Sequence, residues 1–253
     1  MNISLLNRSG LKLEKFTPDP FFSHEIKISQ PENGYRFSLD PFILANQIKA
    51  NGNEKIIDIG CGCGIIPLLL AFKRPDLKIF GVEIQKELYR FARQNIIINR
   101  LEKAIRIIHG NIKDIKPFDI DGQADIIVSN PPYIKKNCGR LNPDSLKAIA
   151  RHEVTLDIDM LFACSNKLLN EKGKLYIIFP AERLSDLILT MANYHFFPAF
   201  IRFVHIKQKT KAKRVILCAV KNTDNVCVVH PPFFVYTSEN KFSPEYASLF
   251  NKV

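Results

Sequence analysis

The tetrapeptide Asn130-Pro131-Pro132-Tyr133 directly follows the apolar run Ala124–Ser129. Such a run is typical of a buried strand, so the tetrapeptide is expected to form a stiff loop at its end. The side-chain oxygen of Asn130 and the carbonyl oxygen of Pro131 could each accept one hydrogen of a planar amine, while Tyr133 stacks on the ring that carries it. These contacts would draw the nitrogen towards a tetrahedral shape and aim its lone pair at an electrophile. On these residues alone, an ordinary Asn-Pro turn remains the alternative.

A glycine-rich loop lies upstream, between the apolar residues 55–59 and a helical run that starts at Ile65. Strand, glycine loop and helix in this order form a nucleotide-binding unit, because glycine lets the backbone pass close to a ligand. A dinucleotide fingerprint needs a third glycine where Ile65 stands, which disfavours a pyrophosphate. The loop resembles instead the S-adenosylmethionine loop of Rossmann-like methyltransferases, whose ligand has no pyrophosphate. The residues that this resemblance assigns to the donor are Asp58, Gly60, Gly62 and Gly64.

The next two predicted strands, residues 78–83 and 105–108, also lead into polar residues. Glu83 lies about twenty residues past the glycine loop, where a carboxylate can accept hydrogen bonds from both ribose hydroxyls. Ile84 could then pack on the adenine face. Related methyltransferases often carry an acidic residue after the third strand, and the amide oxygen of Asn111 could accept the same hydrogen bond from the adenine amino group. Considered alone, Glu83 could be a solvated residue at a strand end.

Strand and helix patterns alternate along the chain, which predicts an α/β fold with a covered parallel sheet. Two late strands, residues 199–206 and 215–220, are joined by a link too short for a parallel crossover, so we expect an antiparallel hairpin. The expected fold is the Rossmann-like class I methyltransferase fold, a seven-stranded, mostly parallel sheet with a reversed last strand and helices on both faces. The other elements predicted after the second strand are helices over 86–99, 156–169 and 183–194 and a strand over 173–179.

The 253 residues, 46% of them hydrophobic, suffice for one sizeable domain. We expect residues 1–50 to close over the donor site, residues 51–222 to form the S-adenosylmethionine-dependent catalytic domain, and residues 223–253 to form a tail packed on it. No apolar stretch approaches the roughly twenty residues of a membrane span, and residues 1–15 lack the apolar core of a signal peptide. These features predict a cytoplasmic protein without a membrane partner.

The six cysteines do not form a metal-binding pattern. They include no Cys-x-x-Cys pair. We therefore expect reduced thiols and no metal site. The cysteines stand at positions 61, 63, 138, 164, 218 and 227.

A net charge of +11 and a pI near 9.4 indicate a polyanionic partner. In an extended chain, alternate lysines between the two hairpin strands would project to one side and could contact successive phosphates. A second basic set follows the tetrapeptide directly and is expected to surround the entrance to the site that the tetrapeptide forms. Solvated charges are the alternative for both sets. The residues predicted to bind RNA are Lys207, Lys209, Lys211, Lys213 and Arg214 in the first set and Lys135, Lys136, Arg140, Arg151 and His152 in the second, near Lys147.

Over nearly its whole length the chain resembles a bacterial family that methylates N6 of the adenine just 3′ of the anticodon of a valine tRNA. The match includes the glycine loop, the tetrapeptide, residues 35–40, residues 150–153 and a tail with Tyr236 and Tyr246. The resemblance implies S-adenosyl-L-methionine as donor and tRNA as partner. It also implies that three residues close over the methionine end of the donor: Arg36, Phe37 and Asp40.

Two other functions remain open. A release-factor glutamine N5-methyltransferase also presents a planar nitrogen to such a tetrapeptide and resembles this chain through residues 129–134. That family, however, carries a helical N-terminal domain, whereas about fifty residues precede the first strand here. A catalytically inactive RNA-binding module is the second alternative, which the intact Asn130 and Tyr133 disfavour. The sequence does not define the oligomeric state, and a monomer is the simplest expectation.

Overall fold

The computed structural model describes residues 26–31, 38–132, 156–224, 226–239 and 241–249. The N-terminal half of the described chain alternates helices and strands, as predicted. In chain order its elements are α1 (Asp40–Gln47), β1 (Lys55–Ile59), α2 (Ile65–Lys73), β2 (Lys78–Glu83), α3 (Lys86–Ile98), β3 (Ile105–His109), the 3₁₀ turn η1 (Pro117–Ile120) and β4 (Ala124–Ser129).

The C-terminal half begins with a capped helix, since the side chain of Asp157 accepts a hydrogen bond from the Met160 N–H at 2.8 Å. This cap explains why the helix starts two residues later than the predicted residue 156. In chain order the elements are α5 (Ile158–Leu168), β5 (Leu169–Pro180), η2 (Ala181–Arg183), α6 (Leu184–Asn193), β6 (Phe196–His205), β7 (Ala212–Lys221), β8 (Val228–Val229), β9 (Phe233–Phe234) and α7 (Pro244–Ser248).

The strands form one sheet in the order β3-β2-β1-β4-β5-β7-β6-β8, and β9 also pairs with β6. β1 to β5 pair in parallel, whereas β7 runs antiparallel to both β5 and β6. The predicted hairpin and the predicted reversed strand are therefore confirmed. β8 and β9 extend the edge of β6 in parallel, and the sequence did not predict them.

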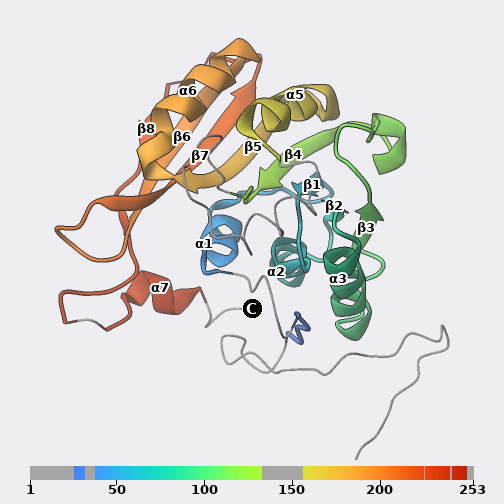
Figure 1. Cartoon of the computed structure of the whole chain (residues 1–253), viewed down its shortest axis with the longest axis horizontal. Coiled ribbons are helices and arrows are strands. Elements are labelled where there is room, and N and C mark those ends of the chain that lie inside the picture. The colour runs from blue at the N-terminus through green and yellow to red at the C-terminus, as the bar shows by residue number, and fades with distance from the viewer. Residues whose placement is uncertain (1–25, 32–37, 133–155, 225, 240, 250–253) are drawn as a thin grey trace, which may run out of the picture.

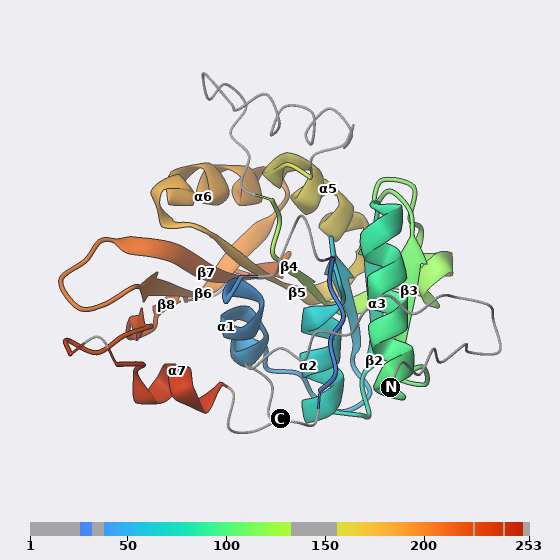
Figure 2. The same ribbon diagram turned by 60° about the horizontal axis from the view of Figure 1, so that its bottom comes forward.

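Both faces of the sheet are covered by helices. α1, α2 and α3 lie on one face, and α5 and α6 lie on the other (Figures 1 and 2). Along β5, Tyr176 and Ile178 join the core under the first group of helices, while Ile177 between them joins the core under the second. This alternation follows from the period of two in a strand, and it explains why the strands are apolar without interruption.

The parallel arrangement brings the carboxyl ends of β1 to β5 to one edge of the sheet. Because β7 is reversed, its first residues lie at this edge as well, where Arg214 is paired with Pro180 at the end of β5. The turn between β6 and β7 therefore lies at the same edge as the ends of β1, β2 and β4. Among the described helices, none combines the length and apolar character that crossing a bilayer requires.

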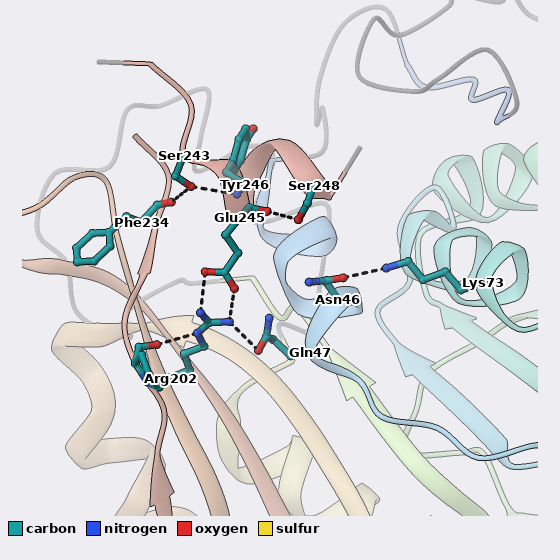
Figure 3. A network of polar contacts seen from close by, with 10 residues as sticks. Asn46, Gln47, Lys73, Arg202, Phe234, Ser243, Glu245, Tyr246 and Ser248 are labelled. Carbon is teal, nitrogen blue, oxygen red and sulfur yellow. Dashed lines mark hydrogen bonds and ion pairs between the residues drawn. The ribbon is translucent and has the colours of Figure 1, made fainter. Parts of the chain in front are cut away.

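Arg202 on β6 ties the C-terminal segment to the rest of the domain (Figure 3). Its guanidinium pairs with the Glu245 carboxylate of α7 at 2.7 Å and donates to the Gln47 side chain of α1 at 3.2 Å. It also donates to the Pro231 carbonyl at 2.9 Å and lies over the Phe233 ring. The Arg202 side chain is only 12% exposed, so this ion pair is shielded from water more than the surface pairs are. One side chain thus joins β6, α1 and α7.

We expect Arg202→Met to lower the free energy of unfolding by about 2 kcal/mol, because the Glu245 carboxylate and the Pro231 carbonyl lose a charged donor in a half-buried setting. Urea denaturation measures this change. Arg106→Met is the matched control, since Arg106 lies 4.0 Å from Asp121 and both side chains are more than 60% exposed. The control should change stability by less than about 0.5 kcal/mol. Equal losses of unfolding free energy in both variants would show that the Arg202 contacts contribute no more than an exposed ion pair.

Candidate active site

The glycine loop between β1 and α2 has a backbone that favours glycine. Gly62 and Gly64 have φ angles of 56° and 81°, in the left-handed region. A Cβ on Gly62 would meet no atom within 4 Å, so this position needs glycine for its backbone conformation alone. A Cβ on Gly64 would lie 3.4 Å from the Cβ of Ala92 on α3, so close helix packing adds a second reason there.

Gly81 in the middle of β2 is a residue that sequence reasoning missed. A Cβ at this position would lie 2.8 Å from the Cys61 sulfur and 2.6 Å from a methyl of Ile107. The glycine therefore makes room for the loop to fold down onto β2. The only sequence signal was a glycine inside an apolar strand, which often marks a close backbone approach.

The Glu83 carboxylate at the end of β2 determines the shape of this loop. Its two oxygens accept hydrogen bonds from the N–H groups of Gly62 at 2.9 Å and of Gln85 at 2.8 Å. The side chain is buried, and backbone donors of this kind stabilise its charged form. A carboxylate can accept more than two hydrogen bonds, and the contact with the ribose hydroxyls stays a prediction.

Asp58 lies beside Glu83 on the neighbouring strand but in a different environment. Neither of its carboxyl oxygens has a hydrogen-bond partner among the described residues, and the side chain is buried at the centre of the sheet. Burial, and then the negative charge of Glu83, raise the pKa of the Asp58 carboxyl well above its ordinary value. The arrangement favours a neutral Asp58 next to a charged Glu83.

The buried thiols in the loop are poor metal ligands. Burial, helped by the negative charges of Glu83 and Glu87, raises the pKa of the Cys63 thiol to about 12, and burial likewise raises the pKa of Cys61. Both thiols are therefore protonated at neutral pH, whereas metals bind thiolates. In the part of the chain that the structure describes, no three His, Cys, Asp or Glu side chains gather into a possible metal site.

A groove opens where β1, β2 and β3 end, opposite the start of α5. The groove is open to solvent and has a volume of about 40 Å³. Ile84 is 41% exposed in this groove, and it offers an apolar surface to a planar ring. The Asn111 side-chain oxygen accepts the Lys113 N–H at 3.1 Å, which holds the amide at the rim of the groove. The lining residues are Ile59, Gly60, Val82, Ile84, Gly110, Asn111, Ile112, Leu156 and Met160.

The described residues of the groove fit the nucleoside part of the predicted donor. A carboxylate lies at the end of β2, an exposed aliphatic side chain follows it, and an amide lies at the end of β3. None of the described residues that line this groove is basic. The assignment of this groove to the nucleoside of the donor stays a prediction.

The first three residues of the tetrapeptide follow the end of β4 next to this groove. Ser129, the last residue of β4, donates its hydroxyl to the Ile59 carbonyl at 2.8 Å and is fully buried. Since Ile59 directly precedes Gly60, this bond joins the strand of the tetrapeptide to the strand of the glycine loop. Asn130 is partly exposed and Pro131 is buried, so the loop leaves the sheet at a fixed point.

Asn95 on α3 is a second residue that sequence reasoning missed. Its side-chain oxygen accepts the Ser29 N–H at 2.6 Å, while its amide nitrogen donates to the Ser29 carbonyl and to the Cys63 carbonyl of the glycine loop, both at 2.9 Å. One turn later, Asn99 makes the same two backbone bonds to Lys27. The pair of asparagines holds residues 27–29 along α3, and Asn95 alone also holds the glycine loop.

Two residues to which the sequence assigned different roles contact each other. Asp40, predicted to contact the donor, is buried at the start of α1 and accepts a hydrogen bond from the Arg214 guanidinium at 2.9 Å. Arg214 was predicted to bind RNA. This pair joins α1 to β7, and both assigned roles stay predictions.

The turn between β6 and β7 differs from the extended chain with alternate lysines on one side that the sequence predicted. The Thr210 hydroxyl and N–H both donate to the Lys207 carbonyl, at 2.6 and 3.3 Å, and Lys209 has a φ of 62°. The prediction of an extended chain is therefore wrong for residues 207–210, because Thr210 closes a compact turn. Lys211 precedes β7 and Lys213 lies within it, so only these two fit the prediction of alternate lysines in an extended chain. All four lysines, 207, 209, 211 and 213, are exposed.

The remaining predicted contacts lie outside the described residues. They are Arg36 and Phe37 of the predicted donor contacts, Tyr133 of the tetrapeptide, and Lys135, Lys136, Arg140, Lys147, Arg151 and His152 of the second basic set. Their roles stay predictions from the sequence.

Comparisons with known proteins agree with this geometry. Residues 40–191 match the family model described as Methyltransferase small domain. A tRNA1(Val) (adenine(37)-N6)-methyltransferase of Porphyromonas gingivalis is 31% identical over 202 residues, which are 78% of each chain. A protein of the same name from Phocaeicola vulgatus is 28% identical and covers 92% of this chain and 96% of its own. A solved O-methyltransferase structure from Agrobacterium tumefaciens has a TM-score of 0.67 and covers 84% of this chain and 96% of its own, and at 17% identity it shows the fold alone.

We expect Asp58→Asn to stabilise the protein more at pH 8 than at pH 5. The folded state raises the pKa of this carboxyl, so it binds a proton that the unfolded chain has released. Wild-type stability therefore falls as pH rises above the ordinary Asp value, by up to about 1.4 kcal/mol per pH unit until the folded carboxyl ionises. The variant lacks this loss. Denaturant titrations of both proteins at the two pH values measure the difference.

The cost of burying the amide that Asp58→Asn introduces is the same at both pH values, so only the pH-dependent part is diagnostic. Asp76→Asn is the control, because Arg74 lowers the pKa of the exposed Asp76 carboxyl. The stability of Asp76→Asn relative to the wild type should be no higher at pH 8 than at pH 5. An Asp58→Asn effect that is equal at pH 5 and pH 8 would mean that this carboxyl titrates normally.

We expect Asn95→Asp to weaken binding of S-adenosylhomocysteine, the product form of the predicted donor, by about tenfold. A carboxylate still accepts from the Ser29 N–H, but it cannot donate to the Cys63 carbonyl that fixes the glycine loop. Asn99→Asp is the matched control, since it removes the same bond to the N-terminal segment without touching the loop. Calorimetric titration of folded samples compares the two. Equal affinities would show that Asn95 has only a structural role.

Proposed function

The chain belongs to the methyltransferase small domain family and to the family of tRNA1(Val) (adenine(37)-N6)-methyltransferases, and we propose that it transfers a methyl group from S-adenosyl-L-methionine to N6 of the adenine just 3′ of the anticodon of a valine tRNA. The observation that carries this proposal is the position of Asn130 and Pro131. They stand at the end of β4, next to the strand end that carries the glycine loop. An acceptor pair for an amine thus lies beside a nucleoside groove.

The donor groove supports the first part of the reaction. When bound, S-adenosylmethionine supplies an electrophilic methyl group on a positively charged sulfur. Glu83 accepts hydrogen bonds from the ribose hydroxyls, Ile84 packs against the adenine, and Asn111 accepts from the adenine amino group with its second lone pair. The left-handed glycine loop lets its backbone approach the amino acid part of the donor. The negative charge of Glu83 also favours a cationic ligand in this site.

The end of β4 supports the second part. The Asn130 side-chain oxygen and the Pro131 carbonyl each accept one N6 hydrogen of the target adenine. This pair of contacts withdraws the nitrogen lone pair from the ring and directs it towards the methyl carbon. The nitrogen becomes acidic once it carries the methyl group, so its proton leaves to water without a strong base. Tyr133 follows in sequence and stacks on the adenine. The bond from Ser129 to Ile59 fixes the distance between acceptors and donor groove.

The charge of the protein supports an RNA substrate. Lys207, Lys209, Lys211 and Lys213 are exposed at the carboxyl edge of the sheet, the edge that carries the site. Lysines at such a place attract phosphates and orient an RNA loop towards Asn130. The target adenine is unpaired in an anticodon loop, so bringing it into the site requires no opening of a duplex. With a tRNA substrate the enzyme works in the cytoplasm, and a monomer suffices.

A release-factor glutamine would present its planar amide to the same acceptors, so this substrate is the alternative. The relatives that cover most of this chain carry the tRNA name, which favours adenine. To test the substrate, the protein is incubated with labelled S-adenosylmethionine and unmodified tRNA, and the RNA is digested to nucleosides. N6-methyladenosine at the position 3′ of the anticodon of a valine tRNA is the expected product. Label on a release factor added in parallel, with none in RNA, would replace the proposal by the alternative.

We expect Asn130→Ala to lower the rate of methyl transfer at saturating substrate by about 100-fold or more, because one of the two acceptors for N6 is lost. Affinity for S-adenosylhomocysteine should change less than threefold or so, since Asn130 acts on the adenine of the RNA. Asn170→Ala is the matched control. Asn170 donates to Asp125 at 2.8 Å, near the opposite end of β4, and its loss should leave the rate unchanged. Loss of donor affinity in Asn130→Ala would instead make Asn130 a structural residue of the groove.

A further inference from the structure

The C-terminal segment returns to the carboxyl edge of the sheet beside the basic turn. After β9 it continues along β6, and the N–H groups of Val235 and Tyr236 donate to the carbonyls of His205 and Ile206 at 3.0 and 2.8 Å. Residues 236–239 therefore start beside the turn of residues 206–211. This turn and residues 236–239 protrude on the same side of the molecule in the two ribbon views (Figures 1 and 2).

Three aromatic rings of this segment form a stack. The Phe242 ring centroid lies 5.1 Å from that of Tyr236 and 4.7 Å from that of Tyr246, with interplanar angles of 18° and 26°. Tyr246 is 1% exposed and belongs to the core, whereas Phe242 is 50% exposed and Tyr236 is partly exposed. The stack thus runs from the hydrophobic core to the surface and leaves half of a phenylalanine in water.

Several contacts hold this stack in place (Figure 3). The Ser243 hydroxyl donates to the Phe234 carbonyl at 2.6 Å and accepts the Tyr246 N–H at 3.0 Å, which caps α7. The Ser243 N–H donates to the Val235 carbonyl at 2.9 Å. Arg202 anchors α7 from the other side through Glu245. A ring held in this way loses little conformational entropy when a ligand stacks on it.

The surroundings of the stack are basic. Four lysines make no ion pair with any residue that the structure describes: Lys207, Lys209, Lys211 and Lys213. Lys241, which directly precedes Phe242, pairs with Glu239 at 3.0 Å. Four such cations next to exposed apolar rings match a ligand that has phosphates and flat bases. Unpaired RNA has both, and stacking of its bases on aromatic side chains is a general mode of binding.

We propose that Phe242 and Tyr236 form a stacking surface for an unpaired base of the RNA substrate, with the lysines of the neighbouring turn contacting the adjoining phosphates. This inference rests on the proposed function and adds a contact on the RNA away from the methylated adenine. A protein partner that buries Phe242 is the competing occupant, and the experiment below separates the two.

The chain contains no tryptophan, so Phe242→Trp introduces a single fluorescent reporter into the stack. We expect unmodified tRNA, and also single-stranded RNA without an adenine target, to quench its emission as a base stacks on the indole. S-adenosylhomocysteine should leave it unchanged. Phe118→Trp is the matched control, because Phe118 is 90% exposed on η1, just before β4 and therefore at the opposite edge of the sheet. Equal quenching at both positions, or none at Phe242→Trp, would overturn the proposal.

Affinity gives an independent readout. Phe242→Ala should raise the Kd for tRNA about tenfold without changing the slope of log Kd against log salt, because a ring carries no charge. Phe242→Tyr should retain wild-type affinity, which rules out a folding defect as the cause. Replacing Lys209 and Lys211 by Ala should reduce the slope by roughly one to two. An unchanged Kd in Phe242→Ala would assign the exposed ring to another partner.

The two proposals fail separately. Quenching of Phe242→Trp by RNA without formation of N6-methyladenosine would leave the stacking surface in place and overturn the proposed reaction. Methylation of tRNA by Phe242→Trp without any quenching would do the reverse.

Discussion

Two acidic side chains lie buried next to each other at the ends of β1 and β2, and the glycine loop takes its shape from one of them. Glu83 receives N–H donors from Gly62 and Gln85, which stabilise its charge. Asp58 has no such donors in the described structure and lies within reach of the Glu83 charge. Since two like charges cannot both persist in a low dielectric, one carboxyl keeps its proton. An anionic pyrophosphate would add negative charge beside the charged Glu83, whereas a cationic sulfonium would be attracted to it.

Side chains that bond to distant backbone then connect the strand ends around these carboxyls. Ser129 joins β4 to β1, and Asn95 joins α3 to the glycine loop and to the segment around Ser29. Asp40 and Arg214 join α1 to β7. In a parallel sheet the ladder bonds align the strands, but they do not hold the loops that leave them. These few side chains therefore supply the rigidity that positions the end of β4 relative to the donor groove.

Much of this fold could be predicted because its signals are local. Uninterrupted apolar runs identify strands buried on both faces, and alternate glycines after such a run identify a strand-to-helix loop. The short link near Lys209 showed that the last two strands pair as a hairpin. Even the reversed strand follows from the length of a connection.

The features that could not be predicted depend on contacts between residues far apart in the chain. Asp40 and Arg214 are 174 positions apart, and each looks like a free charge in the sequence. β8 has two residues and exists only because β6 offers an edge. The turn at Lys209 was expected to be extended because lysines alternate there, whereas the Thr210 hydroxyl decides its form. Asn95 and Asn99 are spaced by one helical turn. This spacing was the single local signal that α3 holds residues 27–29.

The order of the strands also separates the two regions that the proposed reaction needs. The groove proposed for the donor lies at the ends of β1, β2 and β3. The basic turn and the aromatic stack lie at the end of β6 and beyond, and β4 with Asn130 lies between the two regions. Three strand spacings separate β4 from β6, which is about 15 Å. In a stacked helical strand successive nucleotides are about 3.4 Å apart, so about four stacked nucleotides span this distance. For such a strand, the base that we propose to stack on Phe242 would not be the neighbour of the adenine that we propose to lie at Asn130. The two contacts would then fall at separate points of one loop or stem.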